Sequence, residues 1–384
     1  MSKNSINAEL VGHNIDLVEQ ILLFLPAKSL VHCGLVSKTW HALASDHEFA
    51  ALWQQRRLPS GLICHLASRN YTYIRLLDCQ LESESRNKPF EFGNPEKILH
   101  SCNGLLLCEK RYLENREYDK YGYMVYNPTT KQSAFVPQFC QLDEVASVNI
   151  AYDPSKSSDC KVIGLRRPKF VSSYQIYMYS RLNTAYWRCW KPIKNFEVSN
   201  DSKLHDSVFW NNYIVWLWSD ETLCFHVDQE NLFVVPSPPT EKEIHSYYFG
   251  ESRGHLHFIL LDGCSSIRFD VHEMKRDCSK WFLKYSVDLC QVSRSVCKKK
   301  YNGLYYSLLS LIQGENERDL VLVLNLERQI ISYRTDYNKV SYLNKESVNS
   351  VLLRYANGHK SAHHHIESIF GFQFGRGMMA GDSD

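Results

Sequence analysis

The sequence predicts a small all-α module at the N-terminus, followed by a large, mainly-β domain. The first fifty-odd residues carry apolar positions at helical spacing and are interrupted by Pro26. From about Tyr71 onward, β-branched and aromatic runs alternate with Asn, Pro, Gly, Asp and Ser, as in strands joined by turns. The length of 384 residues suits one small and one large domain better than a single core.

The first two helices have clear start and stop signals. Asn14 is a suitable N-cap, and the apolar residues that follow form one stripe, comprising Leu17, Val18, Ile21, Leu22 and Leu25. Pro26 ends this helix and can open a second short helix over residues 27–33. Gly34 then interrupts the pattern.

Two further helices are expected before residue 56. Val36, Trp40 and Leu43 form another apolar stripe, and Asp46 can cap a last helix that carries Phe49, Leu52 and Trp53. Four helices in about forty residues bury only a small core, so a module of this size is usually completed by a neighbour or a partner.

The β region contains several clear strands and no convincing long helix after residue 60. The strongest strand candidates cover residues 104–108, 123–126, 174–179 and 320–324. The polar segments 113–120, 154–159 and 314–319 are expected to be loops.

A recurring unit of strand, turn and strand predicts a β-propeller. Its centres fall at Tyr126, Tyr177, His226, Phe269 and Leu324, with spacings of 51, 49, 43 and 55 residues. One propeller blade takes about 50 residues in such repeats. A further unit around residues 98–108 and a closing segment near residues 350–370 would give five to seven blades. The alternative is a two-sheet sandwich with additional strands.

Composition argues against several classes of function. The net charge of +2 is too balanced for a nucleic-acid-binding or membrane-surface protein, and no apolar run is long enough for a membrane helix. The first residues lack the apolar core of a signal peptide. The 13 cysteines include no C-x-x-C pair, so we expect reduced thiols in the cytoplasm or nucleus, and we expect neither a cofactor nor a metal.

Residues 15–53 resemble the F-box of plant proteins. The resemblance rests on Asp16-Leu17-Val18, Ile21-Leu22, Leu25-Pro26-Ala27-Lys28-Ser29-Leu30, Val36-Ser37-Lys38-Thr39-Trp40 and 46–49. One departure is visible, because the family usually has Leu-Pro where His13 and Asn14 stand.

The rest of the chain resembles the plant F-box-associated domain, which is described as propeller-like and related in type to kelch domains. The matching segments are Ser101-Cys102-Asn103-Gly104, Tyr126-Asn127-Pro128-Thr129-Thr130, 151–155, 208–211, 248–256 and 269–274. The expected organisation is a flexible N-terminus at 1–12, the F-box at 13–55, a linker with first strands at 56–95, the propeller-like domain at 96–372 and a flexible tail at 373–384.

The resemblance implies a non-catalytic substrate receptor of a Skp–cullin–F-box ubiquitin ligase. The F-box would bind a Skp adaptor, and through it cullin and RING subunits, while the β domain would hold an unidentified target protein. An adaptor-bound protein with a regulatory, non-degradative role is the alternative. The residues expected to bind the adaptor are Leu17, Ile21, Pro26, Leu30, Val36 and Trp40, although any one of them could instead belong to the core of so small a module.

Three other motifs suggest chemistry and have simpler explanations. Residues 250–254 match the G-x-S-x-G pattern around Ser252, which would make a serine hydrolase, but a strand follows where that elbow needs a helix, so a hairpin is favoured. His363-His364-His365 could suggest a metal, yet neighbouring residues of a strand face opposite sides. Trp216 and Trp218 share one strand face and suggest a cargo surface, although most tryptophans here are expected in the propeller core.

Overall fold

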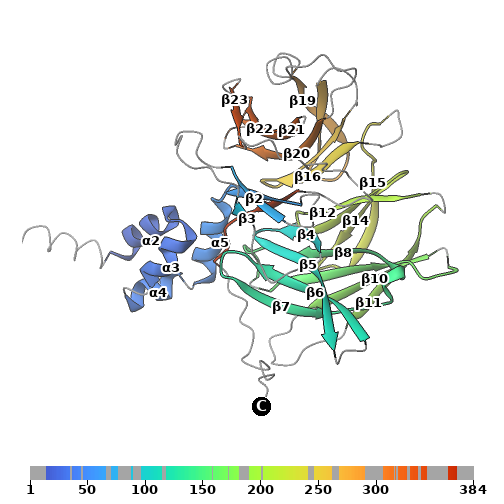
Figure 1. Ribbon diagram of the computed structural model, residues 1–384, viewed down its shortest axis with the longest axis horizontal. Coiled ribbons are helices and arrows are strands. Elements are labelled where there is room, and N and C mark those ends of the chain that lie inside the picture. The colour runs from blue at the N-terminus through green and yellow to red at the C-terminus, as the bar shows by residue number, and fades with distance from the viewer. Residues whose placement is uncertain are drawn as a thin grey trace, which may run out of the picture.

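The computed structural model has a helical module at one side of a six-bladed β-propeller (Figure 1). It describes residues 14–34, 37–44, 46–65, 71–76, 88–89, 97–114, 118–157, 159–171, 173–180, 190–199, 202–240, 246–261, 268–289, 306–314, 316, 319–326, 329–335, 339–343 and 362–369. The expected flexible ends, 1–12 and 373–384, lie outside these residues.

The helical module contains the four helices that the sequence predicts. They are α2 (Ile15–Phe24), α3 (Ala27–Gly34), α4 (Lys38–Ala44) and α5 (His47–Gln55). The predicted caps are confirmed, because Asn14 accepts a hydrogen bond from the Leu17 amide at 3.2 Å and Asp46 accepts one from the Phe49 amide at 2.9 Å. Each cap satisfies an amide that the first turn of a helix leaves without a partner.

Each of the six sheets has four antiparallel strands. Blade 1 comprises β24 (Ala362–His365), β1 (Gly61–His65), β2 (Tyr71–Arg75) and β3 (Lys88–Pro89). Blade 2 comprises β4 (Lys97–Cys102), β5 (Leu105–Glu114), β6 (Tyr118–Asn127) and β7 (Gln132–Pro137). Blade 3 comprises β8 (Val145–Ala151), β9 (Lys161–Arg166), β10 (Ser173–Ser180) and β11 (Lys191–Glu197).

The remaining three blades follow in chain order. Blade 4 comprises β12 (Leu204–Trp210), β13 (Tyr213–Trp218), β14 (Thr222–His226) and β15 (Asn231–Val235). Blade 5 comprises β16 (Tyr247–Ser252), β17 (His255–Leu260), β18 (Arg268–Met274) and β19 (Trp281–Asp288). Blade 6 comprises β20 (Tyr306–Gln313), β21 (Leu320–Leu326), β22 (Gln329–Arg334) and β23 (Lys339–Tyr342).

The ring closes through a strand from the C-terminal part of the chain. Strand β24 pairs with β1, so that Gly61 lies opposite His365 and Cys64 opposite Ala362. The innermost strands β4, β8, β12, β16, β20 and β24 are neighbours in this order, and β24 also adjoins β4. Strand β24 thus becomes the innermost strand of blade 1 and completes the ring of inner strands.

The predicted period locates the blades correctly with one exception. Tyr126, Tyr177, His226 and Phe269 all lie in the third strand of a blade, whereas Leu324 lies in a second strand, β21. Residues 98–108 are not a separate unit, because β4 and β5 share a sheet with Tyr126. The additional blade is instead assembled from β1–β3 and the closing strand.

Two other expectations about the β region need correction. The loop predicted at residues 113–120 is largely strand, because β5 extends to Glu114 and β6 starts at Tyr118. The prediction that Trp216 and Trp218 of β13 line a cargo surface is also wrong, since both are at most 1% exposed and belong to the core.

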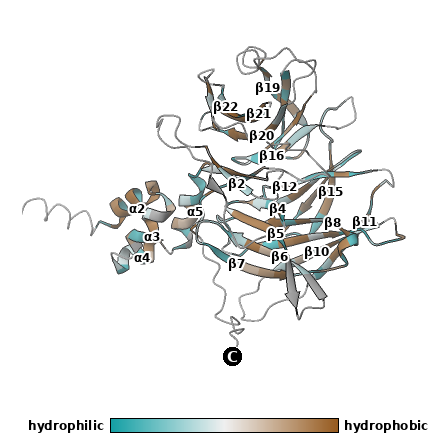
Figure 2. Ribbon diagram, viewed as in Figure 1, coloured by the Kyte–Doolittle hydropathy of each residue, from teal (hydrophilic) through white to brown (hydrophobic). Residues whose placement is uncertain are grey.

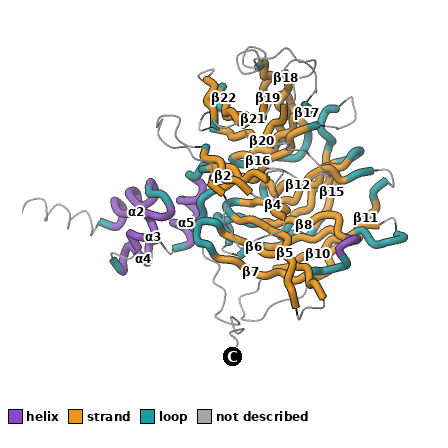
Figure 3. Tube along the Cα trace, viewed as in Figure 1, coloured by secondary structure: helices purple, strands orange, loops and turns teal. Residues whose placement is uncertain are grey.

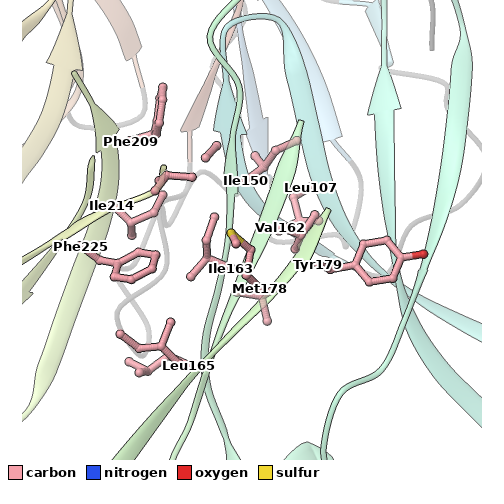
Figure 4. Close-up of a cluster of buried hydrophobic side chains, with 14 of the residues drawn as sticks. Leu107, Ile150, Val162, Ile163, Leu165, Met178, Tyr179, Phe209, Ile214 and Phe225 are labelled. Carbon is pink, nitrogen blue, oxygen red and sulfur yellow. The ribbon is translucent and has the colours of Figure 1, made fainter. Parts of the chain in front are cut away.

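The blades are held together by an apolar core that runs from one sheet to the next. In Figure 4, Ile163 and Met178 of blade 3 lie between Leu107 of blade 2 and Ile214 and Phe225 of blade 4. Figure 2 shows the apolar residues along strands of neighbouring blades. The same alternation that places one side of a strand toward one neighbouring blade places the other side toward the next.

Tryptophan indoles add polar links between neighbouring blades. Trp190 donates to the Pro137 carbonyl at 2.7 Å, and Trp281 donates to the Pro236 carbonyl at 2.8 Å. Trp210 donates to the Gly254 carbonyl at 2.9 Å. An indole suits the boundary between two blades, because its large ring fills the space between the sheets and its one N–H finds an acceptor on the next blade.

The C-terminal segment after β24 is bound by two turns of blade 2. Asn127 donates to the Ser368 carbonyl at 3.1 Å, and the Ser368 amide donates to Thr129 at 3.1 Å. Gly104 has a φ of +88°, and a Cβ there would lie 2.7 Å from the Ile366 carbonyl oxygen. The Asn103-Gly104 and 127–130 segments of the family pattern therefore make the seat for this segment.

The same segment reaches the helical module. Glu367 accepts a hydrogen bond from the Ala27 amide at 3.0 Å, at the start of α3, and Ile369 packs against the core of the module. Arg57 donates to the Leu23 carbonyl at 3.2 Å and lies over the Trp53 ring at 4.1 Å. Burial lowers the pKa of Arg57, and Glu367 acts against this lowering. Helices and propeller are thus joined by hydrogen bonds, charge and packing.

A buried ionic cluster lies on the outer strands of blade 5. His255 lies 2.7 Å from Glu273, the fully buried His257 lies 3.6 Å from it, and Lys284 forms a close ion pair with the same carboxylate. Burial would raise the pKa of Glu273, but hydrogen bonds from these three partners lower it well below its usual range. Burial lowers the pKa of His257.

Replacing Glu367 by Ala should loosen the helical module. The Ala27 amide would lose its acceptor, which costs about 1 kcal/mol for a helix N-cap. Hydrogen exchange of the amides in α3 should therefore become faster, while exchange in the propeller strands stays unchanged. Glu197→Ala, an exposed position on β11, is the control, and equal protection of α3 in both variants would contradict the prediction.

The buried His257 should make the protein less stable in mild acid. In the unfolded chain a histidine titrates near about pH 6.5, so below that pH the unfolded state binds a proton that the folded state resists. The thermal midpoint should fall between about pH 6.5 and pH 5, and less steeply in His257→Gln. His32→Gln, exposed on α3, should leave the slope as it is. An unchanged slope in His257→Gln would show that the group does not contribute.

Candidate protein-binding surfaces

Helix α2 has two apolar faces, one buried and one exposed. Val18 and Leu22 are at most 2% exposed and form part of the core of the helical module. Leu17, Ile21 and Phe24 are 48, 47 and 74% exposed, and their i, i+4, i+7 spacing places them in a row along a neighbouring side of the helix. Exposed apolar residues in a row on one helix mark a surface for a partner more often than isolated ones do.

The six residues predicted to bind an adaptor do not share one environment. Leu17, Ile21 and Pro26 are exposed, and Trp40 is half-buried against the helical core. Leu30 is 1% exposed and lies inside that core. Val36 lies outside the described residues. The exposed three are available for contact, whereas Leu30 can act only by supporting the module.

Sequence reasoning missed Phe24, the most exposed large apolar residue of the helical module in the part of the chain that the structure describes. Arg56 lies 5.4 Å from the centre of its ring. Its signal was present, because position 24 continues the series of positions 17 and 21 at helical spacing. The buried stripe of Val18 and Leu22 runs beside this exposed row, so in the sequence the two rows look like one apolar stripe.

Of the two residues that depart from the family pattern, His13 and Asn14, the structure describes Asn14. Asn14 caps α2, so the position where the family usually has a proline still begins the helix. His13 lies outside the described residues.

Comparison with known proteins agrees with this arrangement. Residues 14–51 match the family model of the F-box domain. F-box protein At5g07610 of Arabidopsis thaliana is 29% identical, over 86% of this chain and 85% of that protein. The N-terminal module is therefore an F-box domain. F-box protein CPR1 of the same plant is 30% identical, over 48% of this chain and 46% of its own length.

Solved structures match this chain only at low sequence identity. A functionally unknown protein from Desulfotomaculum acetoxidans covers 75% of this chain and 83% of its own length, with 12% identity and a TM-score of 0.42.

A second exposed surface lies at the end of blade 3 away from the helices. Strand β8 runs from Val145 to Ala151, and β9 returns so that Arg166 pairs with Val145. The short helix η1 (Leu142–Glu144) and residues 167–171 therefore share that end. Figure 3 shows the four helices at one side of the molecule and η1 at the opposite side.

Phe170 protrudes from this second surface in a strained conformation. It is fully exposed, and its φ of +64° lies in the left-handed region that a bulky side chain rarely adopts. Glu144 holds the segment in place by accepting from the Arg167 amide at 2.7 Å through its carbonyl and from the Lys169 amide at 3.3 Å through its side chain. Leu142 and Val171 are also exposed nearby. Strain of this kind persists where the surroundings enforce it, often at functional sites.

A cavity of about 500 Å³, lined by polar and apolar residues alike, lies between the inner strands and α5. Its lining includes Gln54 and Arg57 from the helical side and the turns at Asn103, Asn211 and Arg253 from the blades. The helical module therefore stands beside this end of the propeller, whereas η1 lies at the opposite side of the molecule.

The other two motifs fold as structural elements. Ser252 ends β16, accepts a hydrogen bond from the Gln313 amide at 2.9 Å and is followed by a turn and β17, so the predicted hairpin is confirmed. His363–His365 lie in β24, where His364 contacts Ser310 and His365 contacts Ser60. Within the described part of the chain, no helix is both long and apolar enough to span a membrane.

Proposed function

We propose that this chain is the substrate-recognition subunit of a Skp–cullin–F-box ubiquitin ligase. The F-box binds a Skp-type adaptor, which connects it to cullin and RING subunits, and the propeller holds the target protein. The observation that carries the proposal is the exposed apolar row on α2 within the residues that match the F-box domain. The chain acts in the cytoplasm or nucleus and needs no cofactor.

The adaptor surface consists of Leu17, Ile21, Phe24 and Pro26, which we call the α2 surface. Three of these side chains are large and apolar, and burying each against a partner contributes about 1.5–3 kcal/mol at most. Because a few such residues usually carry most of the binding energy, this small surface suffices for a specific complex.

The receptor contributes proximity rather than bond chemistry. A ubiquitin thioester on a conjugating enzyme reacts faster with a target lysine when both are held in one assembly. A flexible connection would dilute this effect, since effective concentration falls as the linker lengthens. The contacts of Glu367, Ile369 and Arg57 support a fixed orientation of propeller and F-box.

We assign target binding to the end of the propeller opposite the helices. Phe170 is a preorganised aromatic anchor there, and aromatic side chains are enriched among residues that dominate protein interfaces. The near end is less available, because α5 and the segment 366–369 stand beside it.

A regulatory, non-degradative role is the competing function. It requires the same adaptor contact and the same target contact. The two functions differ only in the fate of the bound target.

Exposed positions of the α2 surface allow a clean test of adaptor binding. The double variant Leu17→Ser/Ile21→Ser should bind a purified Skp-type adaptor at least about tenfold more weakly, because loss of hot-spot contacts commonly exceeds 1.4 kcal/mol. Isothermal titration calorimetry with the full chain measures this. Leu283→Ser, 53% exposed on β19, is the matched control and should bind normally. Wild-type affinity in the double variant would refute the assigned surface.

Leu30→Ala is a poorer probe than these variants. Leu30 lies in the core, and removing a buried leucine side chain costs about 2–5 kcal/mol, which would unfold so small a module. Any loss of binding would then reflect folding.

Target half-life separates the degradative from the regulatory role. Proteins captured by the wild-type chain in plant cells should turn over more slowly when Leu17→Ser/Ile21→Ser replaces it. Phe170→Ala should lengthen the same half-lives through weaker capture, with adaptor binding intact. Pulse-chase labelling with immunoprecipitation measures both.

Phe135→Ala is the control for the second variant, because Phe135 is 44% exposed on the outer strand β7. Unchanged half-lives in the α2 double variant, despite lost adaptor binding, would favour the regulatory role. Normal capture by Phe170→Ala would show that the target binds elsewhere.

A further inference from the structure

Two cysteine thiols face each other across the boundary between blades 4 and 5. Cys224 lies on β14, and Cys278 lies in the turn between β18 and β19. Their side chains are hydrogen-bonded to each other, and both thiols are free. Cys278 also packs against the apolar cluster that contains Cys224. The two thiols therefore interact within one apolar cluster although 54 positions separate them in the sequence.

The two thiols differ in access to solvent. Cys224 is 1% exposed, whereas Cys278 is half-buried in an otherwise exposed turn. That turn carries Lys275, Arg276 and Lys280 against one acidic residue, Asp277. A small oxidant can reach Cys278 but not Cys224 while the blades stay packed.

The contact also distinguishes the two thiols chemically. The hydrogen bond from Cys224 lowers the pKa of Cys278, and the same bond together with burial raises the pKa of Cys224. A thiolate is the nucleophile in thiol oxidation, so the outer sulfur is the more reactive one. An accessible, activated thiol beside a second thiol is the arrangement of redox-sensitive cysteine pairs.

We propose that Cys278 is oxidised by hydrogen peroxide and that Cys224 resolves the product to a disulfide that links blades 4 and 5. The Cys278 thiolate attacks one peroxide oxygen, the O–O bond breaks, and a sulfenic acid forms while hydroxide leaves and takes a proton to become water. The Cys224 sulfur then attacks the sulfenic sulfur, the S–O bond breaks, an S–S bond forms, and a second molecule of water leaves. Two thiols and one peroxide thus give one disulfide and two waters.

The disulfide would fasten β14 to the turn that closes β18 and β19. It constrains the unfolded chain and the boundary between the two blades, so the oxidised protein should be the more stable form. A dithiol reductant reverses the reaction by thiol–disulfide exchange.

The test uses the purified full chain with dilute hydrogen peroxide. After quenching, free thiols are blocked with N-ethylmaleimide in denaturant, and tryptic peptides are analysed by mass spectrometry. The expected result is a peptide pair joined through Cys224 and Cys278 that outnumbers every other cysteine pair and disappears with dithiothreitol. The thermal midpoint of the oxidised protein should rise by several degrees.

Variants and an unfolded control make the outcome decisive. Cys278→Ser should leave Cys224 free for N-ethylmaleimide, and Cys224→Ser should convert Cys278 to sulfinic acid. Cys160→Ser, which removes another half-buried thiol, should retain the linked pair. The proposal is overturned if the pair is absent after peroxide treatment, or if it forms equally well in chain unfolded in urea beforehand.

Discussion

The pairing of β24 with β1 is the contact on which the rest of the structure depends. It completes blade 1, sets β24 between β20 and β4, and so closes the ring of inner strands. The residues that follow β24 then bind the turns of blade 2 and enter the core of the helical module. One four-residue strand therefore connects three parts of the molecule that the sequence order keeps far apart.

The contacts of the segment after β24 also explain why segments 103–104 and 127–130, which match the F-box-associated pattern, have the residues that they have. Asn127 and Thr129 bind both sides of the Ser368 backbone, and Gly104 leaves the room that the segment needs. The residue types match the backbone of the bound segment. The Asn127 amide donates to a carbonyl, the Thr129 hydroxyl accepts from an N–H, and Gly104 has no side chain that would collide with the segment. The F-box inherits a fixed position relative to the propeller from the same contacts.

The sequence was most informative where the signals are local. Asn14, Pro26 and Asp46 mark helix boundaries through caps and a missing amide, and the structure follows them. The repeated third strands also reveal the propeller, since Tyr126, Tyr177 and their counterparts recur at blade spacing. Such features depend on residues within one turn or one hairpin.

Features set by distant contacts could not be predicted in this way. The sequence predicts a closing segment near residues 350–370, but no local pattern shows that this segment pairs with β1 and brings His365 to Ser60, 305 positions away. Leu30 and Leu17 look alike in sequence, yet packing buries one and exposes the other. The exposure of Phe170 could not be predicted from its neighbours in the sequence, because Glu144 of η1 holds the segment that carries it.

The position of β24 gives synthesis on the ribosome a particular order of events. Every other described strand emerges before β24, so the ring stays open until residues 362–365 have been synthesised. Ile369 packs against the helical core, so this contact also forms only after residue 369 is made, although the helices themselves emerge first. A chain that terminates before β24 therefore lacks both the strand that closes the propeller and the contacts of Glu367 and Ile369 with the helical module.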